Sequence, residues 1–569
     1  MIIKKYCSRF ETPRVQLSRE AYENSGIEIF SSEKLPFAGR TSPEFARNLV
    51  KLLVSRVGKL EKSGRSFPDG IHIYELGAGT GILAKRILDL LKTNHKDIYR
   101  QIVLHASDIS RPMITQLKNL SDFKEHQGRV SFEVMDALQP KFTHKPLLVY
   151  FTNLIDSLPC HRHLLVKDGR IFEYQFQSSL KKDAQIIDPT FYPPKVLEEK
   201  EIAGLLTSSD VERRLILAPQ ILTVLEEETE TVPIADISNM GQEERKDIAD
   251  RAASLTKGRP FAFTYNYPVR KALRKIIQAL EEGGFILFSD FGVVSEGHEM
   301  VLPLEFGMVF AFPADFPGLK QVAERMGKAC YLSSNLLPYP QEMLIDTFPK
   351  DGQAKSPFEK TSAPRTQEKV NDFLEDVKKI LSEGRAVISQ KSQKIARLYR
   401  SLPEEARTDY SLLNELAFLL LQIGFYQEAG FYADILLKNF GHAAGIYYYL
   451  VKGKSLQELG DPKGAEGFFK EAIASRKGFL AYAYLSELYW QQKRYREYIE
   501  VVKEYLKYTR GGDWLKSIFF IALAQENLFG HETALKTLKE LTDLGLQLRK
   551  PSPQERELLG QAQAVLDAG

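Results

Sequence analysis

The stretch IHIYELGAGTGILAKRILDLL at residues 71–91 constrains the fold more than any other part of the sequence. An apolar run ends in Glu75, and glycines follow at Gly77, Gly79 and Gly81. This pattern predicts a β-strand, a tight turn and an α-helix. Glycines suit a turn that needs positive φ angles and that a ligand approaches closely, because a side chain would obstruct both. We therefore expect this turn to bind a nucleotide-like small molecule.

The glycine spacing indicates which kind of nucleotide binds. Dinucleotide-binding turns carry GxGxxG, and phosphate-binding loops carry GxxxxGK[ST], with a lysine that neutralises phosphate. Here the spacing is ExGxGxG without such a lysine, which favours a cofactor that lacks phosphate groups. S-adenosylmethionine (SAM) is such a cofactor, and the pattern resembles motif I of the class I methyltransferases. A glycine-rich turn of another α/β domain is the alternative. The expected cofactor-binding residues of the turn are Glu75, Gly77, Ala78, Gly79 and Gly81.

The whole chain is long and nearly neutral in charge. Its 569 residues suffice for two or more domains, because a single core rarely exceeds about 300 residues. With 77 Lys and Arg against 74 Asp and Glu, its charge indicates neither a nucleic acid nor a membrane as partner. Three separate cysteines without a CxxC pair predict no disulfide framework and no zinc site, and we expect no metal. The N-terminal MIIKKYCSRF is no signal peptide, so we expect a cytoplasmic protein.

Two further apolar runs, at 102–106 and 130–134, each end near an aspartate. The first aspartate would accept hydrogen bonds from both hydroxyls of a ribose, unless it only caps the next helix. The second would lie at the edge of an adenine, where a carboxylate and a backbone amide match the donor and acceptor of the base. The expected cofactor contacts here are Asp108, Ile109, Asp136 and Ala137.

The fourth strand, expected at 146–151, leads into TNLIDSLP. Ligands of open α/β sheets lie beyond the carboxyl ends of the strands, so Asn153 and Asp156 would emerge beside the methyl group of the cofactor. Methyl transfer is an in-line displacement in which the protein aligns the nucleophile and removes its proton. We therefore predict Asp156 and Asn153 as catalytic residues that orient a nitrogen acceptor, with Asn153 also in contact with the cofactor. The alternative is that both residues only stabilise a turn.

The remaining segments of the first domain complete the α/β fold. RHLLVKDGRIFEYQF predicts a β-hairpin across its Asp-Gly pair. Residues 196–258 resemble a helical insertion, in which the acidic run EEETE is most simply a solvated face. A helix then precedes an apolar strand that ends at Asp290, and a last strand near 307–312 is expected to finish the sheet. We place the domain at 1–350.

In this order the motifs resemble those of the MidA-like SAM-dependent methyltransferases, which include mitochondrial complex I assembly factors that methylate protein arginine. The motifs SPEF, ELGAGTGIL, SDISRPMITQL, TNLIDSLP and GGFILFSDFG carry the resemblance over about 38–328. The sequence departs from the family at Leu154, where glutamate is usual, and FAFPADF at 310–316 lacks a histidine found in the family. The resemblance implies cofactor binding by Glu75, Gly77, Gly79, Gly81 and Asp108, with Asn153 and Asp156 near the acceptor.

The C-terminal third is helical and periodic. Residues 351–409 are polar and predict a linker with connecting helices. Over 410–569 similar segments recur about every 34 residues, the period of tetratricopeptide (TPR) repeats. We expect a superhelix that binds a protein, with an irregular helical bundle as the alternative. The residues that recur at the helix contacts are Ala429, Ala465, Tyr498 and Ala534.

These patterns together predict a Rossmann-like class I methyltransferase with a helical insertion, followed by an all-α TPR-like superhelical domain. The expected function is SAM-dependent methyl transfer to a nitrogen, with arginine as one option, of a protein or complex that the repeats recruit. Two alternatives stay open. One is a methyltransferase-fold adaptor with little or no activity that scaffolds a protein complex, and the other is a methyltransferase of small molecules.

Overall fold

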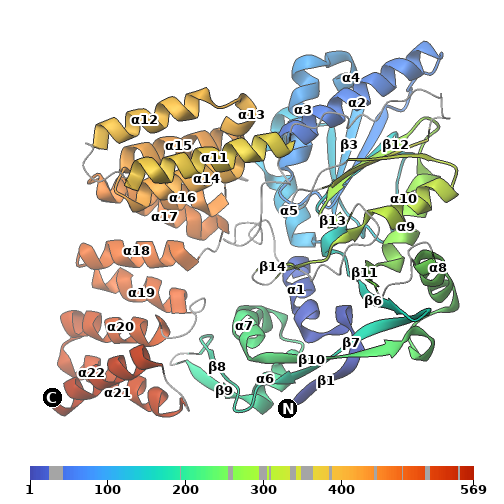
Figure 1. The fold of residues 1–569 in the computed structure, drawn as a ribbon. Helices are drawn as coiled ribbons and strands as arrows, with labels where there is room; N and C mark the ends of the chain where they lie inside the picture. The colour runs from blue at the N-terminus through green and yellow to red at the C-terminus, as the bar shows by residue number, and fades with distance from the viewer. Residues whose placement is uncertain are drawn as a thin grey trace.

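The computed structural model describes residues 1–24, 43–159, 161–191, 194–253, 261–293, 304–306, 309–333, 341–347, 363–382, 388–440, 445–476, 479–506, 513–548 and 552–568. The chain forms an α/β region up to residue 347 and a helical region from residue 363 onward, which lie side by side (Figure 1). No helix in these ranges is both long enough and apolar enough to span a membrane.

The large sheet has the strand order β17-β18-β12-β5-β2-β3-β4. The parallel strands are β2 (Ile71–Leu76), β3 (Ile102–Asp108), β4 (Val130–Val134), β5 (Leu148–Thr152) and β12 (Phe285–Asp290). The antiparallel strands are β18 (Gln341–Asp346) and β17 (Ala329–Leu332). The strand order reverses between β2 and β5, and ligands of such sheets bind at this switch point, beyond the carboxyl ends.

Helices cover both faces of this sheet. Ile71 and Ile73 of β2 pack in one apolar cluster with helices α2 (Pro43–Lys62), α3 (Ile82–Asn94) and α5 (Arg111–Asn119). Tyr74 and Leu76 pack in another cluster, with α9 (Tyr267–Ala279) and α10 (Phe316–Arg325). Successive side chains of a strand point to opposite faces, so one apolar strand serves both layers. The strand, glycine turn and helix predicted over 71–91 are thus confirmed.

The last strands of the sheet differ from the expectation. The segment near 307–312 does not join the sheet, because β15 (Val309–Ala311) pairs with β14 (Leu304–Phe306) in a separate hairpin. Strands β18 and β17 complete the sheet instead. The polar residues Gln341 and Glu342, which begin β18, are buried against β12. A strand that starts with two polar residues shows no apolar run, and only its place in the sheet explains its burial.

A second sheet has the order β1-β7-β6-β11, with β10 also on β7, and all of its strands except the N-terminal β1 lie between β5 and β12 in the chain. Its strands are β1 (Ile2–Ser8), β6 (Arg162–Lys167), β7 (Arg170–Leu180), β10 (Leu225–Pro233) and β11 (Phe261–Tyr265). The expected hairpin joins β6 to β7. The small strands β13 (Gly292–Val293) and β16 (Ala314–Asp315) form a separate pair.

The insertion at 196–258 is only partly helical. It contains α6 (Glu199–Leu206), α7 (Val211–Val224) and α8 (Gln242–Ala253), but the acidic run lies in strand β10. Glu227 of this run forms ion pairs with Arg9 and Arg14, while Glu226, Glu228 and Glu230 are exposed. Pairing along the whole of β7 and this alternation outweigh the low strand propensity of glutamate.

The helical region is an array of antiparallel helix pairs. After α11 (Ala363–Ser382), α12 (Ile388–Ser401) and α13 (Glu404–Arg407) come the pairs, and α22 (Pro553–Ala568) follows them. The pairs are α14 (Tyr410–Gln422) with α15 (Tyr426–Phe440), α16 (Gly445–Glu458) with α17 (Pro462–Arg476), α18 (Phe479–Gln491) with α19 (Tyr495–Leu506), and α20 (Asp513–Phe529) with α21 (His531–Leu546). The predicted contact residues Ala429, Ala465, Tyr498 and Ala534 are all buried.

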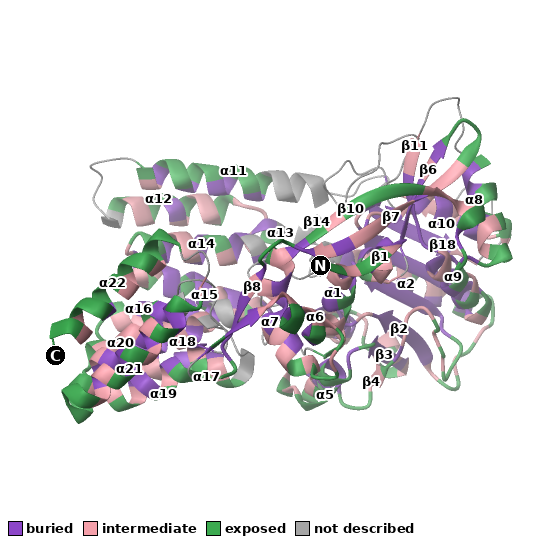
Figure 2. Cartoon of the chain, turned by 90° about the horizontal axis from the view of Figure 1, so that it is seen from below, coloured by how far each residue is buried: buried purple, intermediate pink, exposed green. Residues whose placement is uncertain are grey.

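Two contacts are among those that join the described parts of the two regions. The guanidinium of Arg86 on α3 lies over the ring of Phe440 at the end of α15, 4.6 Å from its centroid. The hairpin of β8 (Gln185–Asp188) and β9 (Lys195–Glu198) places Ile187 and Val196 in the apolar cluster of the last helix pairs. Figure 2 shows buried residues running through the sheet and the paired helices, while α22 at the end of the array is largely exposed.

Candidate active site

Bare backbone forms the turn between β2 and α3. Gly77, Gly79 and Gly81 have φ angles of 71°, 52° and 72°, a region that residues with side chains rarely adopt. A Cβ atom on Gly77 would lie 2.9 Å from Leu154 Cδ1. Ala78, between the first two glycines, is buried. The glycines that the sequence singles out therefore form a turn at the switch point of the sheet whose backbone angles and close neighbours disfavour side chains.

Asp108 ends β3 beside this turn, and its carboxylate has protein partners. Its Oδ2 accepts hydrogen bonds from the Gly79 N–H at 3.1 Å and from the Tyr22 hydroxyl at 3.1 Å, and its Oδ1 accepts one from the Ser110 N–H at 3.0 Å. The side chain is 1% exposed, and burial raises its pKa. Tyr22 belongs to α1 (Pro13–Asn24). Its hydroxyl donates a hydrogen bond to Asp108, as a ribose hydroxyl is expected to do.

Three more predicted contacts lie along the same edge of the sheet. Ile109 follows Asp108 directly and is 37% exposed. Asp136 and Ala137 follow β4 and are partly exposed. The Asp136 Oδ1 accepts a hydrogen bond from the Leu138 N–H at 2.9 Å, so this aspartate stabilises its own turn. Ala137 lines an apolar cavity beside the glycine turn.

Three buried oxygens at the ends of β2 and β5 form no hydrogen bond of good geometry in the protein: Glu75 Oε2, Tyr150 Oη and Asn153 Oδ1. Glu75 pairs in register with Tyr150 of the neighbouring strand, and the Tyr150 hydroxyl acts on the pKa of the Glu75 carboxyl as a nearby donor, while Asn153 follows that strand with a φ of 48°. Burial raises the pKa of Glu75 well above its usual range. Buried polar atoms nearly always have partners, so these oxygens mark a place where hydrogen-bond donors of a ligand fit.

Asp290, at the end of β12, holds the loop that follows β5. Its Oδ2 accepts hydrogen bonds from the N–H groups of Leu154 at 3.0 Å and Ile155 at 2.7 Å, and its Oδ1 accepts one from the next residue at 2.8 Å. Burial and the charge of Asp156 raise the pKa of Asp290 well above its usual range. From the sequence, Asp290 is predicted only to end a strand, although Asp108 is singled out because it, too, is an aspartate at the end of an apolar strand.

Asp156 is 3% exposed and lies in the short 3-10 turn Ile155–Ser157. Its backbone oxygen accepts a hydrogen bond from the Phe312 N–H at 2.6 Å. The ring of His161 stacks on Phe312 with 4.8 Å between centroids, and its Nε2–H donates to the Ile155 carbonyl at 2.8 Å. Burial lowers the pKa of His161 to about 4. A neutral histidine thus contacts the segment FAFPADF, but this histidine belongs to the part of the chain that follows TNLIDSLP.

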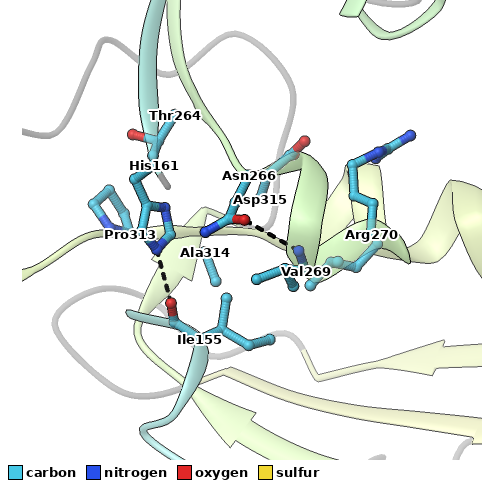
Figure 3. Close-up of a pocket in the computed structure, with 10 residues that line it drawn as sticks. Ile155, His161, Thr264, Asn266, Val269, Arg270, Pro313, Ala314 and Asp315 are labelled. Atoms are coloured by element: carbon cyan, nitrogen blue, oxygen red, sulfur yellow. Dashed lines mark hydrogen bonds between the residues drawn. The ribbon is translucent and has the colours of Figure 1, made fainter. Parts of the chain in front are cut away.

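A pocket behind this loop shows how the loop is anchored (Figure 3). Asn266 caps α9, because its Oδ1 accepts a hydrogen bond from the Val269 N–H at 3.1 Å. Its Nδ2 donates to the Pro159 carbonyl at 2.8 Å. These bonds and the bond from His161 to Ile155 tie the loop to α9 and to β6. The loop with Asn153 and Asp156 is therefore fixed from several elements.

Comparisons with known proteins give one family match. Residues 54–302 match the model of a family described as "putative S-adenosyl-L-methionine-dependent methyltransferase". The match covers less than half of the chain. No curated protein matches the sequence significantly.

Several solved structures are distantly similar. A COG1565 superfamily member from Burkholderia thailandensis, bound to S-adenosyl-homocysteine, is 15% identical, with 58% of this chain and 74% of that chain covered and a TM-score of 0.35. MamA from Desulfovibrio magneticus is 17% identical, with 32% and 98% covered and a TM-score of 0.25. YrrB, a TPR protein with an unusual peptide-binding site, is 12% identical, with 36% and 98% covered and a TM-score of 0.26.

The residues present fit the cofactor that the family match implies. SAM has no phosphate, carries an ammonium group and a positive sulfonium, and suits a bare glycine turn beside the acceptor oxygens of Glu75 and Asn153. The buried oxygens and the positive φ angles of Gly77 and Gly79 are independent of the family match. Residues 54–302 thus resemble a family of putative SAM-dependent methyltransferases, and S-adenosyl-L-methionine is the cofactor that this family implies.

Proposed function

We propose that this chain is a methyltransferase that transfers the methyl group of SAM to a nitrogen of a protein recruited by its helical repeats. The observation that carries the proposal is the pair of oxygens without a hydrogen bond of good geometry, Glu75 Oε2 and Asn153 Oδ1, buried beside the glycine turn at the switch point of the sheet. A turn that merely connected a strand to a helix would need neither buried acceptor, since each unpaired polar atom costs stability.

In this proposal the cofactor is held by backbone and carboxylates. Gly77 and Gly79 admit it, Glu75 accepts hydrogen bonds from its donors, and Asp108 binds its ribose once the Tyr22 hydroxyl gives way. When bound, SAM supplies a methyl group on a sulfonium, which leaves as a neutral thioether. Nothing in this step needs a charged leaving group to be stabilised, so the task of the protein is alignment.

The loop after β5 performs that alignment. Asn153 and Asp156 orient the acceptor nitrogen, and Asp156 takes its proton. Asp290 fixes the backbone of Leu154 and Ile155 between them, so both catalytic side chains keep their places. An arginine nitrogen is the acceptor that the resemblance implies, although Leu154 offers no carboxylate to a guanidinium.

The helical region is the proposed binding site for the protein substrate. Stacked helix pairs form an extended surface that suits a peptide or a folded partner. Arg86, which meets Phe440 of this region, is on α3, the helix that the glycine turn begins. A substrate held by the repeats would therefore be attached to the same elements that form the cofactor site.

Transfer of labelled methyl groups tests the proposal. We incubate the full chain with methyl-labelled SAM and a cell extract and expect label in a protein band. Asp156→Ala should reduce transfer by at least about 100-fold, because it removes the proton acceptor. Ser157→Ala, at the exposed neighbour in the same turn, should retain transfer. Label in small molecules alone would instead favour the small-molecule enzyme.

A methyltransferase-fold adaptor is the second candidate, and the position of Leu154 favours it. This side chain lies against Gly77 where the family usually has a carboxylate. The adaptor would bind SAM without using it. Calorimetric binding of SAM, combined with no label in any fraction, would support the adaptor and exclude the enzyme.

A further inference from the structure

Three histidines gather toward the amino-terminal end of β2, away from the glycine turn. His72 is the second residue of β2, His105 lies in β3, and His144 lies in the segment before β5. One ring nitrogen of each lies within 4.8 Å of those of the other two. His72 and His105 are buried at 5% and 4% exposure, whereas His144 is exposed. The cluster is therefore enclosed by the sheet and open to solvent on one side.

The hydrogen bonds of the two buried histidines determine where their protons are. His72 Nε2 lies 2.9 Å from the carbonyl oxygen of Asp69, which can only accept, so this nitrogen carries the proton. His105 Nδ1 lies 2.9 Å from Glu133 Oε1, which as a carboxylate accepts as well, and 2.9 Å from Ser131 Oγ, whose hydroxyl donates to the same carboxylate oxygen at 3.2 Å. The remaining nitrogens, His72 Nδ1 and His105 Nε2, face each other at 3.0 Å. With the protons placed in this way both of these atoms present lone pairs, which a shared proton or a metal cation would satisfy.

The third histidine is tied to the same place. Its backbone N–H donates to the Tyr74 hydroxyl at 3.1 Å, and Thr143 Oγ1 lies 3.0 Å from that hydroxyl and 3.2 Å from His144 Nδ1. The ring of His144 stacks on that of His72 with 4.0 Å between centroids. Tyr74 in turn stacks on His105 at 4.1 Å. The segment before β5 thus holds His144 at the open side of the buried pair.

We propose that His72 Nδ1, His105 Nε2 and a ring nitrogen of His144 bind one zinc ion, with water as the fourth ligand. The rings of His72 and His144 are parallel in the structure, so the exposed ring of His144 turns out of this stack when it binds the ion. Imidazole nitrogens suit zinc, and three protein ligands with an open position are a common arrangement. Zinc–nitrogen bonds of about 2.0–2.1 Å in a tetrahedron place ligand nitrogens about 3.3 Å apart, close to the 3.0 Å between the buried pair. The Asp69 carbonyl and the Glu133 carboxylate supply the outer hydrogen bonds that metal-bound histidines usually make.

A second cluster of potential metal ligands, Asp89, Glu125 and His126, has a complete hydrogen-bond network without a metal. His126 Nε2 bonds to Asp89 at 2.9 Å and its Nδ1 to the Tyr99 hydroxyl at 3.0 Å. Lys85 pairs with Asp89 and Lys92 with Glu125, both at 2.7 Å. Each charge there has a partner of opposite sign, and no two lone pairs face each other. That cluster therefore gives no reason to expect a metal.

The zinc site would fasten the segment before β5 to β2 and β3. The expectation of no metal depends on the cysteines, which carry no information about a site made of histidines. The three histidines come from separate elements, so no local motif indicates the site. A metal that binds the native state and not the unfolded one stabilises the native state. We therefore assign the ion a structural role, independent of methyl transfer.

Metal titration of the full, tag-free chain tests this proposal. After dialysis against a chelator, we titrate ZnCl2 by calorimetry and expect one ion per chain and a higher Tm. Cobalt(II) in place of zinc should give the visible absorption of a tetrahedral site. His144→Ala, which removes an exposed ligand, should weaken zinc binding by at least about 10-fold, and Glu133→Gln should weaken it by about 10- to 100-fold.

His531→Ala provides the matched control, because this exposed histidine of α21 lies outside the cluster. It should bind zinc as the wild type does. If His144→Ala does not fold, as judged by circular dichroism, Glu133→Gln decides the outcome. Equal zinc affinity of the wild type and the variants, or no binding by the wild type, would mean that a shared proton satisfies His72 and His105, and would overturn the proposal.

Discussion

The α/β region and the helical region differ in what they bury. In the described part of the helical region, the buried polar side chains are Ser455, Ser486, Ser517 and Thr537, and no acid or base is among them. At the carboxyl edge of the large sheet, the buried acids of the described residues are Glu75, Asp108, Asp156, Asp290 and Glu342. Burying a charge without full pairing is unfavourable, so this edge lowers the stability of the fold. The candidate site therefore differs from the repeats in that it buries acidic side chains, which lowers the stability of the fold. The described repeats bury none, so packing alone explains them.

The largest expected effect lies where the two regions join. Phe440→Ala should lower the free energy of unfolding by about 3–5 kcal/mol, because it opens a cavity at a fully buried ring and removes the contact with Arg86. Chemical unfolding measures the change. Phe431→Ala on the same helix, where the ring is 58% exposed, should change stability by less than about 0.5 kcal/mol. Similar losses in the two variants would show that the regions do not depend on this contact.

Asp290→Ala should have the next largest effect, and it tests the carboxyl edge directly. The substitution leaves one buried and two partly buried N–H groups without an acceptor, and we expect a loss of about 2–4 kcal/mol. Methyl transfer should fall further than stability predicts, because the loop that carries Asp156 is released. Asp97→Ala, at a side chain that is 92% exposed, is the control. Full stability of Asp290→Ala would mean that the buried charge costs as much as its hydrogen bonds contribute.

The sequence predicts the features that local patterns encode. The glycine turn, the acids at the ends of β2 and β3, and the helix pairs around Ala429 and Ala465 all follow from spacing along the chain. The rest depends on contacts between distant segments. Strand β18 begins with two polar residues, so its sequence does not indicate a buried strand. The hydroxyl of Tyr22 donates to Asp108 from a helix 86 residues earlier in the chain. No local pattern contains such distances.

The candidate site shows the same division. Each predicted residue from Glu75 to Asp156 lies at the carboxyl edge of the sheet, because parallel strands align their ends. The chain order does not reveal that Asp290 supports the loop after β5, nor that His161 takes up a place against Phe312. The partners of both side chains depend on how distant segments of the chain pack together. Sequence patterns therefore locate the candidate site, and the structure identifies the residues that hold that site in shape.

Glu75→Gln should have a moderate effect whose sign depends on pH. Burial raises the pKa of Glu75 in the folded chain above its ordinary value of 4.5, so the native state loses stability as pH rises from about 4.5 toward the folded pKa. The neutral glutamine removes this loss. We expect urea unfolding to show a gain on the order of 1 kcal/mol at pH 8 that vanishes near pH 4, together with weaker SAM binding. A gain that is equal at both pH values would contradict the assignment, and Glu61→Gln, at an exposed position of α2, serves as control.

The smallest expected effect belongs to the repeats. Gly424, Gly460 and Lys493 end the first helices of three successive pairs with φ angles of 85°, 86° and 56°, and the N–H of the following residue bonds back to the helix each time. Lysine resists this left-handed conformation and glycine does not. Lys493→Gly should therefore stabilise the chain by about 0.5 kcal/mol, part of the gain being offset by the freer unfolded chain, whereas Gly460→Ala should destabilise it by about 1 kcal/mol. If thermal unfolding shows that Lys493→Gly is destabilising, the lysine side chain must contribute contacts that outweigh its backbone strain, and the repeats would then contain a costly position of the kind that otherwise marks the sheet edge.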